Sequence, residues 1–255
     1  MKPLITVVAP TWNRPRLLER SLDSIARQGH RPLEVLVVDD GDGAADTVAR
    51  WRAGAAFELP AATLDNRGAG QVAARNLGVA QAKGEIVAFL DDDDFWSDST
   101  YLGRVAAALA GPYGAAFASG RIVVEDEAMR LSDSLEFAAV ADAKSIRKDN
   151  QILISGFAFA RRLFAELGPF DASLPYYWDW DWHLRLFAAG VAFADLGEAG
   201  ICISARGGTV SSAAFDESRR ANLDRLAAKH GLGELRLRNH EGIARDRRGG
   251  DAPPA

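Results

Sequence analysis

The sequence predicts an α/β fold in which a mostly parallel central sheet is flanked by helices. Short runs rich in Val and Ile alternate with stretches whose apolar residues recur at helical spacing, and this alternation is typical of βαβ units. Three of the predicted strands end abruptly in polar turns, which would converge at one sheet edge because the strands are parallel. Since the 255 residues contain no internal repeat and no compositional shift that marks a linker, we expect a single domain over residues 1–244.

The first half of the chain carries most of this pattern. Each predicted helix follows a predicted strand and ends at a breaker, such as Gly29 or Gly84, before the next apolar run begins. Apolar residues from Leu17 to Ile25 recur at helical spacing and predict the first helix. The other predicted elements are strands Ile5–Ala9, Glu34–Val38, Phe57–Leu59 and Glu85–Leu90, and helices Ala44–Trp51 and Gln71–Gln81.

The second half is less regular. Residues 125–150 are polar with weak periodicity, and no structure is predicted for them. The residues from 245 to 255 are polar and rich in Gly and Pro, so we expect a disordered tail. The predicted elements are helices Tyr101–Leu109, Arg161–Leu167, Trp182–Ala189 and Phe215–His230, and strands Ala115–Val124 and Ile152–Phe159.

The composition excludes several classes of protein. A net charge of -5 argues against a nucleic-acid partner. Cys202 is the only cysteine, so no intramolecular disulfide can form, which fits a reducing compartment. No apolar run approaches the roughly 20 residues of a membrane span, and the amino terminus lacks a signal-peptide pattern. We therefore expect a cytoplasmic protein with no integral membrane segment, and the arginines of the tail leave open a peripheral contact with the inner membrane face.

Four consecutive aspartates, Asp91–Asp94, directly follow the apolar run Ile86–Leu90. Like charges packed side by side cost energy unless a cation compensates them. Carboxylate oxygens suit Mg²⁺ or Mn²⁺, which commonly bridge protein carboxylates to substrate phosphates. A solvated acidic loop or a helix N-terminus would also be acidic, but the buried strand that ends here favours a ligand site. The run therefore predicts a metal–phosphate site.

Further segments of the chain carry a resemblance to a known family. They are Pro10-Thr11-Trp12-Asn13-Arg14, Val37-Val38-Asp39-Asp40-Gly41, Asn66-Arg67-Gly68, Ala73-Ala74-Arg75-Asn76, Phe89-Leu90-Asp91-Asp92-Asp93-Asp94-Phe95-Trp96, Gly168-Pro169-Phe170-Asp171 and Trp178-Asp179-Trp180-Asp181-Trp182-His183-Leu184-Arg185-Leu186. In this order, across residues 4–190, they resemble the motifs of the inverting, bacterial-type GT-A glycosyltransferases of family 2. The chain departs from the family pattern at Trp178, where the family usually has Glu, and at His183, where it often has Trp.

The resemblance implies a Rossmann-like GT-A fold, with residues 1–96 as the nucleotide-binding half and residues 97–244 as the acceptor and catalytic half. It implies transfer of a sugar from a nucleoside-diphosphate sugar, with a UDP-sugar favoured, to an acceptor hydroxyl. The implied cofactor is Mn²⁺ or Mg²⁺. The acceptor stays open among a glycan, a lipid-linked molecule and a small molecule.

The resemblance also assigns roles to individual residues. Asp179 would be the general base, and Asp93 and Asp91 would hold the metal, with Asp93 the more direct ligand. Asp92 and Asp94 are expected to face solvent or to be structural. The implied contacts to the nucleotide sugar are Pro10, Thr11, Asn13, Asp39, Arg67, Arg75, Asp91, Asp92 and Arg206.

Some of these contacts have structural alternatives. Asp39 would accept a hydrogen bond from a pyrimidine N–H, whereas Asp40-Gly41 already supplies ordinary turn chemistry. Asn13 would instead cap a helix, and Arg75 would instead lie on a helix surface. Arg206 lies beside Gly207-Gly208 in a loop that resembles a lid over the diphosphate, and a plain surface loop is the alternative.

The implied acceptor contacts are Trp178, Trp180 and Asp181. Indole rings can stack on sugars, although core packing is the commoner fate of Trp, and we expect at least one Trp of this segment to be in the core. If a helix begins at Trp182, Asp181 would be its N-cap instead. For His183 a satisfied structural hydrogen bond is expected rather than catalysis.

Two other classes of function would use some of the same residues. A sugar nucleotidyltransferase would need a Gly-rich basic loop directly after the first strand, and Pro10-Thr11-Trp12-Asn13 is not such a loop. A non-catalytic nucleotide- or glycan-binding protein of the same fold would not need both the metal aspartates and Asp179, so their presence favours an enzyme.

Overall fold

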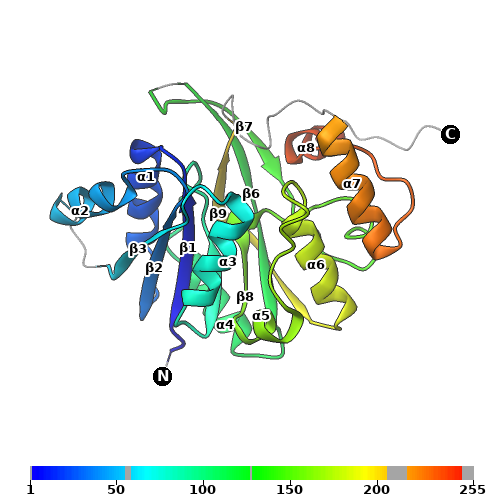
Figure 1. The fold of residues 1–255 in the computed structure, drawn as a ribbon, viewed down its shortest axis with the longest axis horizontal. Coiled ribbons are helices and arrows are strands. Elements are labelled where there is room, and N and C mark those ends of the chain that lie inside the picture. Colours follow the sequence, from blue (N-terminus) through cyan, green and yellow to red (C-terminus); the bar gives the residue numbers. More distant parts are fainter. Residues whose placement is uncertain (1, 55–58, 127, 206–216, 249–255) are drawn as a thin grey trace.

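The computed structural model describes residues 2–54, 59–126, 128–205 and 217–248, in which a nine-stranded sheet is flanked by helices (Figure 1). The strand order is β3-β2-β1-β4-β8-β6-β9-β5, and β7 pairs with β6 on the side of this path. None of the helices in these ranges is long and apolar enough to cross a membrane.

The first half forms the parallel part of the sheet. Its strands are β1 (Ile5–Thr11), β2 (Leu33–Asp39), β3 (Ala61–Asp65) and β4 (Ile86–Phe89), and its helices are α1 (Pro15–Ala26), α2 (Ala44–Gly54) and α3 (Gln71–Gln81). Neighbouring strands of this half run parallel. Thr11 lies beside Asp39, and Val8 of β1 lies beside Phe89 of β4. The polar turns after β1, β2 and β4 therefore lie at one edge of the sheet, as the sequence predicts.

The strand predicted at Phe57–Leu59 is misplaced. Phe57 lies outside the described residues, Leu59 belongs to no strand, and the strand that pairs with β2 is Ala61–Asp65. Its position is set by the ladder with β2, in which Val35 pairs with Ala61. A short run of Ala and Thr has too little apolar periodicity to show this strand in the sequence.

The second half of the sheet is mixed. Strand β6 (Ala115–Glu125) lies between β8 (Phe157–Ala160), which is antiparallel to it, and β9 (Phe193–Ser204), which is parallel to it. Strand β8 is antiparallel to β4 and joins the two halves. The predicted strand Ile152–Phe159 begins instead with a 3₁₀ turn at Ile154–Gly156.

Three strands of this half have no counterpart in the predictions: β5 (Phe95–Trp96), β7 (Leu131–Phe137) and β9. Strand β5 has only two residues, and most of β7 is exposed, so neither shows an apolar pattern. The glycines Gly197 and Gly200 interrupt the pattern of β9, and both have positive φ.

The helices of the second half are α4 (Tyr101–Leu109), α5 (Arg162–Leu167), α6 (Trp178–Ala188), α7 (Glu217–His230) and α8 (His240–Arg248). Helix α6 begins at Trp178, four residues earlier than predicted, with Tyr177 in the N-cap position. The tail is predicted to be disordered over residues 245–255. It is helical as far as Arg248, in a helix whose Ile243 and Ala244 are buried in the core, and residues 249–255 lie outside the described residues.

A cluster of aromatic rings holds α6 against the sheet. Trp182 is fully buried, and its ring lies 5.2 Å from those of Phe159 and Phe170. Phe89 at the end of β4 contacts Phe170 and Trp178 at centroid distances of 5.8 and 6.1 Å. Aromatic pairs of this kind add to the large apolar area that each ring buries. The first turn of α6 is therefore fixed next to the end of β4.

Candidate active site

A cleft of about 420 Å³ lies at the carboxyl edge of β1 and β4. Its lining includes three segments that are distant in the sequence: the turn after β1, the loop Asp91–Asp94 after β4, and the first turn of α6. Residues of α7 and α8 and of the segment between them line a further side. The described lining includes the sequence-predicted residues Pro10, Thr11, Arg75, Asp91, Asp92, Asp93, Trp178, Asp179 and Trp180. The fold thus brings most of the predicted site into one cavity.

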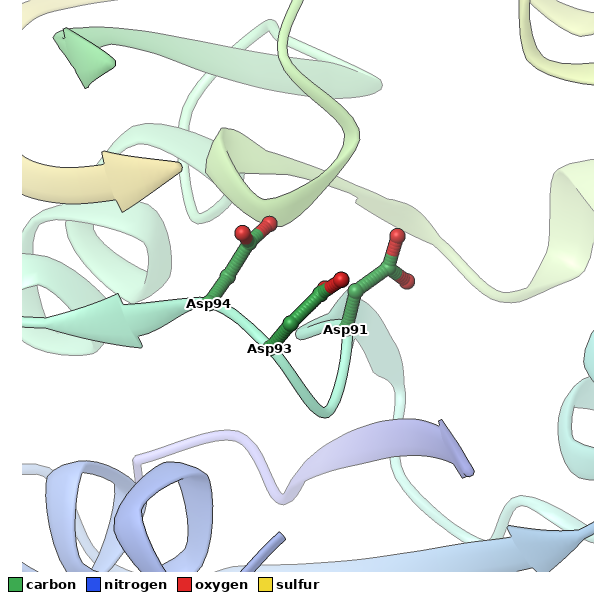
Figure 2. Close-up of side chains that lie close together, drawn as sticks. All are labelled: Asp91, Asp93 and Asp94. Atoms are coloured by element: carbon green, nitrogen blue, oxygen red, sulfur yellow. The ribbon is translucent and has the colours of Figure 1, made fainter. Parts of the chain in front are cut away.

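The loop after β4 gathers three carboxylates. Oxygens of Asp91, Asp93 and Asp94 lie within 4.8 Å of one another, and Figure 2 shows the three side chains on one side of this loop. Burial, and then the charge of Asp91, raise the pKa of Asp93. A group of hard oxygen donors that repel one another fits a divalent cation such as Mg²⁺ or Mn²⁺.

Asp94 belongs to this cluster, although the sequence placed it outside the metal site. Its side chain is buried and accepts hydrogen bonds from Ser155 Oγ at 2.5 Å and from the Ser204 amide at 3.0 Å. Burial, followed by the charges of Asp93 and Asp91, raises the pKa of Asp94. Ser155 Oγ also accepts a hydrogen bond from the Asp91 amide at 3.2 Å, so one hydroxyl bonds to both ends of the loop.

Asp92 is buried rather than solvent-facing. Its carboxylate accepts hydrogen bonds from Thr11 Oγ1 at 2.7 Å and from Arg14 at 3.2 Å, and burial followed by the charge of Asp93 raises its pKa to about 6. Arg14 also pairs with Asp93 at 2.8 Å. Arg14 is not among the predicted site residues, although its place at the end of the first motif is a usable signal.

The two predicted arginines of the first half differ in burial and in distance from the cleft. Arg75 is 3% exposed, donates a hydrogen bond to Asp91, and lies 4.7 Å above the ring of Trp178, so it is not a surface residue. The Arg67 side chain is 87% exposed, lies 3.7 Å from Asp65, and does not line the cleft formed by the described residues. The structure therefore does not bring Arg67 to the site.

Asp39 and Asn13 line an adjoining pocket of about 240 Å³, which shares Thr11 and Arg14 with the cleft. The two carboxylate oxygens of Asp39 accept hydrogen bonds from the backbone amides of Gly41 at 3.0 Å and Ala44 at 2.9 Å. Asp39 itself, rather than Asp40, makes the hydrogen bond of this turn.

Asn13 does not cap a helix. Its side-chain oxygen accepts the Asp42 amide at 2.8 Å, and the N-cap position of α1 is occupied by Arg14. Asn13 thus braces the turn after β1 against the turn after β2.

Asp179 lies in the first turn of α6 and lines the cleft. Burial raises its pKa to about 6, although the Trp180 amide and the Asn150 side chain donate hydrogen bonds to it, the latter at 2.7 Å. A carboxylate with a pKa near neutrality can accept a proton at physiological pH. Asn150 falls in the segment without predicted structure, and no sequence signal pointed to it.

Asp181 has a structural role instead of contacting an acceptor. It is fully buried, and it pairs with Arg185 at 2.9 Å, Lys229 at 2.7 Å and His230 at 2.8 Å. Burial acts to raise its pKa, but the hydrogen bonds from His230 and Lys229 and the charge of Arg185 hold the pKa below its usual value. It is not the N-cap of α6, because the helix begins three residues earlier.

Three predictions remain. Trp178, Trp180 and Trp182 are all buried in the core, at 4%, 3% and 0% exposure, and the first two also reach the cleft lining. His183 is fully buried against Phe157, and its ring nitrogens have no hydrogen-bond partner in the described part of the chain, contrary to expectation. Arg206 lies outside the described residues.

The parallel half of the sheet has aspartates at its strand ends, and the mixed half adds a carboxylate to the same cleft. This is the arrangement of a GT-A glycosyltransferase. Residues 6–168 match Glycosyl transferase family 2, and the chain belongs to this family. The uncharacterised glycosyltransferase YwdF of Bacillus subtilis is 34% identical over 250 residues, which are 92% of this chain and 87% of that protein. The chain is thus an enzyme of the glycosyltransferase class.

Solved structures support the fold. A mannosyltransferase from Pyrobaculum calidifontis, in complex with GDP-Man and Mn²⁺, has 23% identity and a TM-score of 0.64 over 92% of this chain. S. aureus TarS, in complex with UDP-GlcNAc, has 20% identity and a TM-score of 0.63 over 90% of this chain. This chain covers 66% of each of these two solved chains.

Proposed function

We propose that the protein is a metal-dependent, inverting glycosyltransferase that moves a sugar from a nucleoside-diphosphate sugar to an acceptor hydroxyl. The observation that carries the proposal is that a carboxylate cluster suited to a divalent cation and a separate carboxylate with a raised pKa line the same cleft. The nucleotide sugars bound by the two similar solved proteins support a donor of this class.

The metal site would consist of Asp91, Asp93 and Asp94. The cation would be Mn²⁺ or Mg²⁺, and when bound it would act as a Lewis acid that stabilises the negative charge on the departing diphosphate. Arg75 and Arg14 hold Asp91 and Asp93 from two sides, which keeps the carboxylates in place and adds positive charge near the phosphates.

The nucleoside would occupy the pocket lined by Thr11, Asn13 and Asp39, which adjoins the metal cluster through Arg14. Uridine is the favoured base, because Asp39 retains lone pairs that can accept a pyrimidine N–H although its oxygens already bind two amides. Among the described residues, these donor contacts come from the first half of the chain.

The second half would supply the catalytic base. Asp179 takes the proton from the acceptor hydroxyl while that oxygen attacks the anomeric carbon from the face opposite the diphosphate, so that the configuration inverts. Asn150 keeps the carboxylate oriented. Trp178 and Trp180 would contact the acceptor only through the few atoms that reach the cleft, because they are 4% and 3% exposed. The acceptor would be a glycan, a lipid-linked molecule or a small molecule.

Calorimetry with UDP tests the donor and metal assignments. Addition of Mn²⁺ should strengthen UDP binding by at least about tenfold, and Asp93→Ala should abolish this gain. Asp133→Ala, which removes an exposed carboxylate on β7, is the matched control and should behave like the unaltered protein. Equal UDP affinity with Mn²⁺ and with EDTA would refute metal dependence, and tighter binding of GDP would refute the preference for uridine.

Inversion can be tested without a known acceptor, because water can replace the acceptor hydroxyl. Slow hydrolysis of UDP-glucose, whose glucose is α-linked, should release β-glucose first, as NMR can detect before the anomers equilibrate. Release of α-glucose first would exclude the single displacement with Asp179 as base.

A further inference from the structure

One side of the cleft is not used by the proposed donor. It is lined by Arg219 of α7 and by Arg236 and Arg238, which lie between α7 and α8. In Figure 1 α7 lies beside α6 and α8 lies near β7, across the molecule from β1–β3. The metal cluster and the nucleoside pocket belong to the first half of the chain, so this arginine side is available for another part of the substrate.

The charges on this side are predominantly positive. Asp149 is the only carboxylate among its described lining residues, and it pairs with Arg238 at 3.0 Å. Asp246 of α8, which does not line the cleft, pairs with the same arginine. Arg236 is exposed and forms no ion pair with any residue in the described ranges. Arg219 is 5% exposed, and its guanidinium carbon lies 5.6 Å from the centre of the Tyr176 ring. His240, which also lines the cleft, adds no charge at neutral pH, because burial followed by the charge of Arg219 lowers its pKa to about 4.

The arginine side is connected to the proposed base. Asn150 donates a hydrogen bond to Asp179 at 2.7 Å, and the preceding residue, Asp149, holds Arg238. An acceptor whose hydroxyl reaches Asp179 can therefore extend its remaining atoms along Tyr176 and Tyr177 toward the arginines. The donor phosphates, by contrast, would lie at the metal cluster.

We propose that Arg219, Arg236 and Arg238 bind a phosphate group of the acceptor, so that the enzyme glycosylates a phosphate-bearing acceptor. The proposal rests on the proposed function and names its substrate class. Guanidinium groups bind phosphate with paired, charge-assisted hydrogen bonds. A tetrahedral phosphate presents three oxygens to donors from different directions, whereas a planar carboxylate presents two, so three arginines match phosphate better.

The phosphate could belong to a soluble sugar or polyol phosphate, or to a lipid headgroup. Calorimetry on protein saturated with UDP and Mn²⁺ provides the test, with glycerol 3-phosphate as the probe and glycerol as the neutral control. We expect glycerol 3-phosphate to bind and glycerol not to bind. Arg236→Gln should weaken the binding about tenfold, because it removes charge-assisted hydrogen bonds, and UDP affinity should not change.

Arg236 is exposed, so Arg236→Gln should fold normally, whereas Arg219→Gln needs a melting curve alongside because Arg219 is buried. Arg162→Gln is the matched control: it removes an exposed arginine that pairs with Glu166 on α5, outside the cleft. Sedimentation with phosphatidic acid vesicles and with phosphatidylcholine vesicles separates the two sources. Binding to the acidic vesicles that depends on Arg236 would indicate a lipid phosphate, and binding to glycerol 3-phosphate alone would indicate a soluble one.

Three results would overturn the inference. They are absence of any phosphate binding by the UDP-loaded protein, tighter binding of glucuronate than of glycerol 3-phosphate, and a loss of UDP affinity in Arg236→Gln, which would place the arginines at the donor. Failure of the unaltered protein to bind UDP would instead contradict the proposed function, so the two failures can be told apart.

Discussion

Two acidic regions of this molecule contain aspartates at short spacing, and the structure treats them in opposite ways. In the loop after β4, Asp91, Asp93 and Asp94 each have a carboxylate oxygen within 4.8 Å of the others. In the first turn of α6, Asp179 and Asp181 are separated by one residue, yet Asp179 lines the cleft and Asp181 is surrounded by cations in the core. The carboxylates of the loop thus share one environment, whereas the two carboxylates of the helix lie in different environments.

The difference teaches that backbone geometry decides whether neighbouring carboxylates act together. A tight turn, closed by the Asp94 amide on the Asp91 carbonyl at 3.1 Å, folds the loop so that its side chains converge. On a helix, residues two apart point about 200° from each other, so they meet different surroundings. The same residue type consequently has a raised pKa at position 179 and a lowered pKa at position 181.

The largest expected effect separates the two aspartates of α6. Asp179→Asn should reduce transfer, or hydrolysis of the UDP-sugar donor, by about 10²–10⁴-fold, because the amide cannot accept the proton. UDP affinity should stay within a few-fold, since the donor contacts are elsewhere. The measurement is the rate and the UDP dissociation constant of Asp179→Asn and of Asp181→Asn. A normal rate in Asp179→Asn together with an inactive Asp181→Asn would reverse our assignment.

The pH dependence should show the same carboxylate. Asp179 must be ionised to act as a base, so kcat/KM should fall as the pH drops through about 6. Burial also raises the pKa of Asp92 to about 6, so Asp92→Asn is the control, and in it the acid limb should persist. An acid limb that disappears in Asp92→Asn would assign the titration to Asp92 instead of Asp179.

The contribution of Asp179 to stability changes with pH in the opposite direction to its contribution to activity. Because the folded state raises the pKa of Asp179 from 3.8 to about 6, the folded state binds the proton more tightly than the unfolded chain. This contribution to stability is fully present below pH 3.8 and is lost as the pH rises through about 6. Melting curves of Asp179→Asn should therefore lose this part of the pH dependence.

Asp181→Asn should mainly affect stability. It removes the charge that pairs with Arg185, Lys229 and His230. A hydrogen bond to a charged group contributes about 1.5–3 kcal/mol to stability. For a chain of this size, we expect the melting temperature to fall by about 3–10 °C. Asp224→Asn, in an exposed pair with Arg220 on α7, is the control and should change the melting temperature little.

The smallest expected effect concerns the loop region. Ser155→Ala removes the hydroxyl that joins the Asp91 amide to the Asp94 carboxylate, and should cost about 1 kcal/mol of stability. If convergence of the loop carboxylates requires this hydroxyl, Mn²⁺ affinity, measured by calorimetry, should fall several-fold. Unchanged Mn²⁺ affinity would show that the backbone turn alone arranges the cluster.

Much of the fold and part of the site could be predicted. Helices Gln71–Gln81 and Tyr101–Leu109 have the predicted bounds, because a strong helical period and clear breakers are local features. Strand β9 could not be predicted, because its ladder with β6 is formed between segments far apart in the chain. The place of Arg75 in the cleft was an open alternative, since a helix sequence alone does not show which face meets the site.

By itself, the sequence determined the α/β class, the family, and the two carboxylate-bearing segments, since runs of apolar residues and short motifs are properties of neighbouring residues. Only the tertiary structure decided that Asp94 joins the metal cluster, that Asp181 is buried among cations, and that Asn150 supports Asp179. It also placed the arginines of the α7–α8 side in the same cleft. These outcomes depend on which distant side chains come within a few ångströms, and burial and pairing at that distance set the charge and the role of each group.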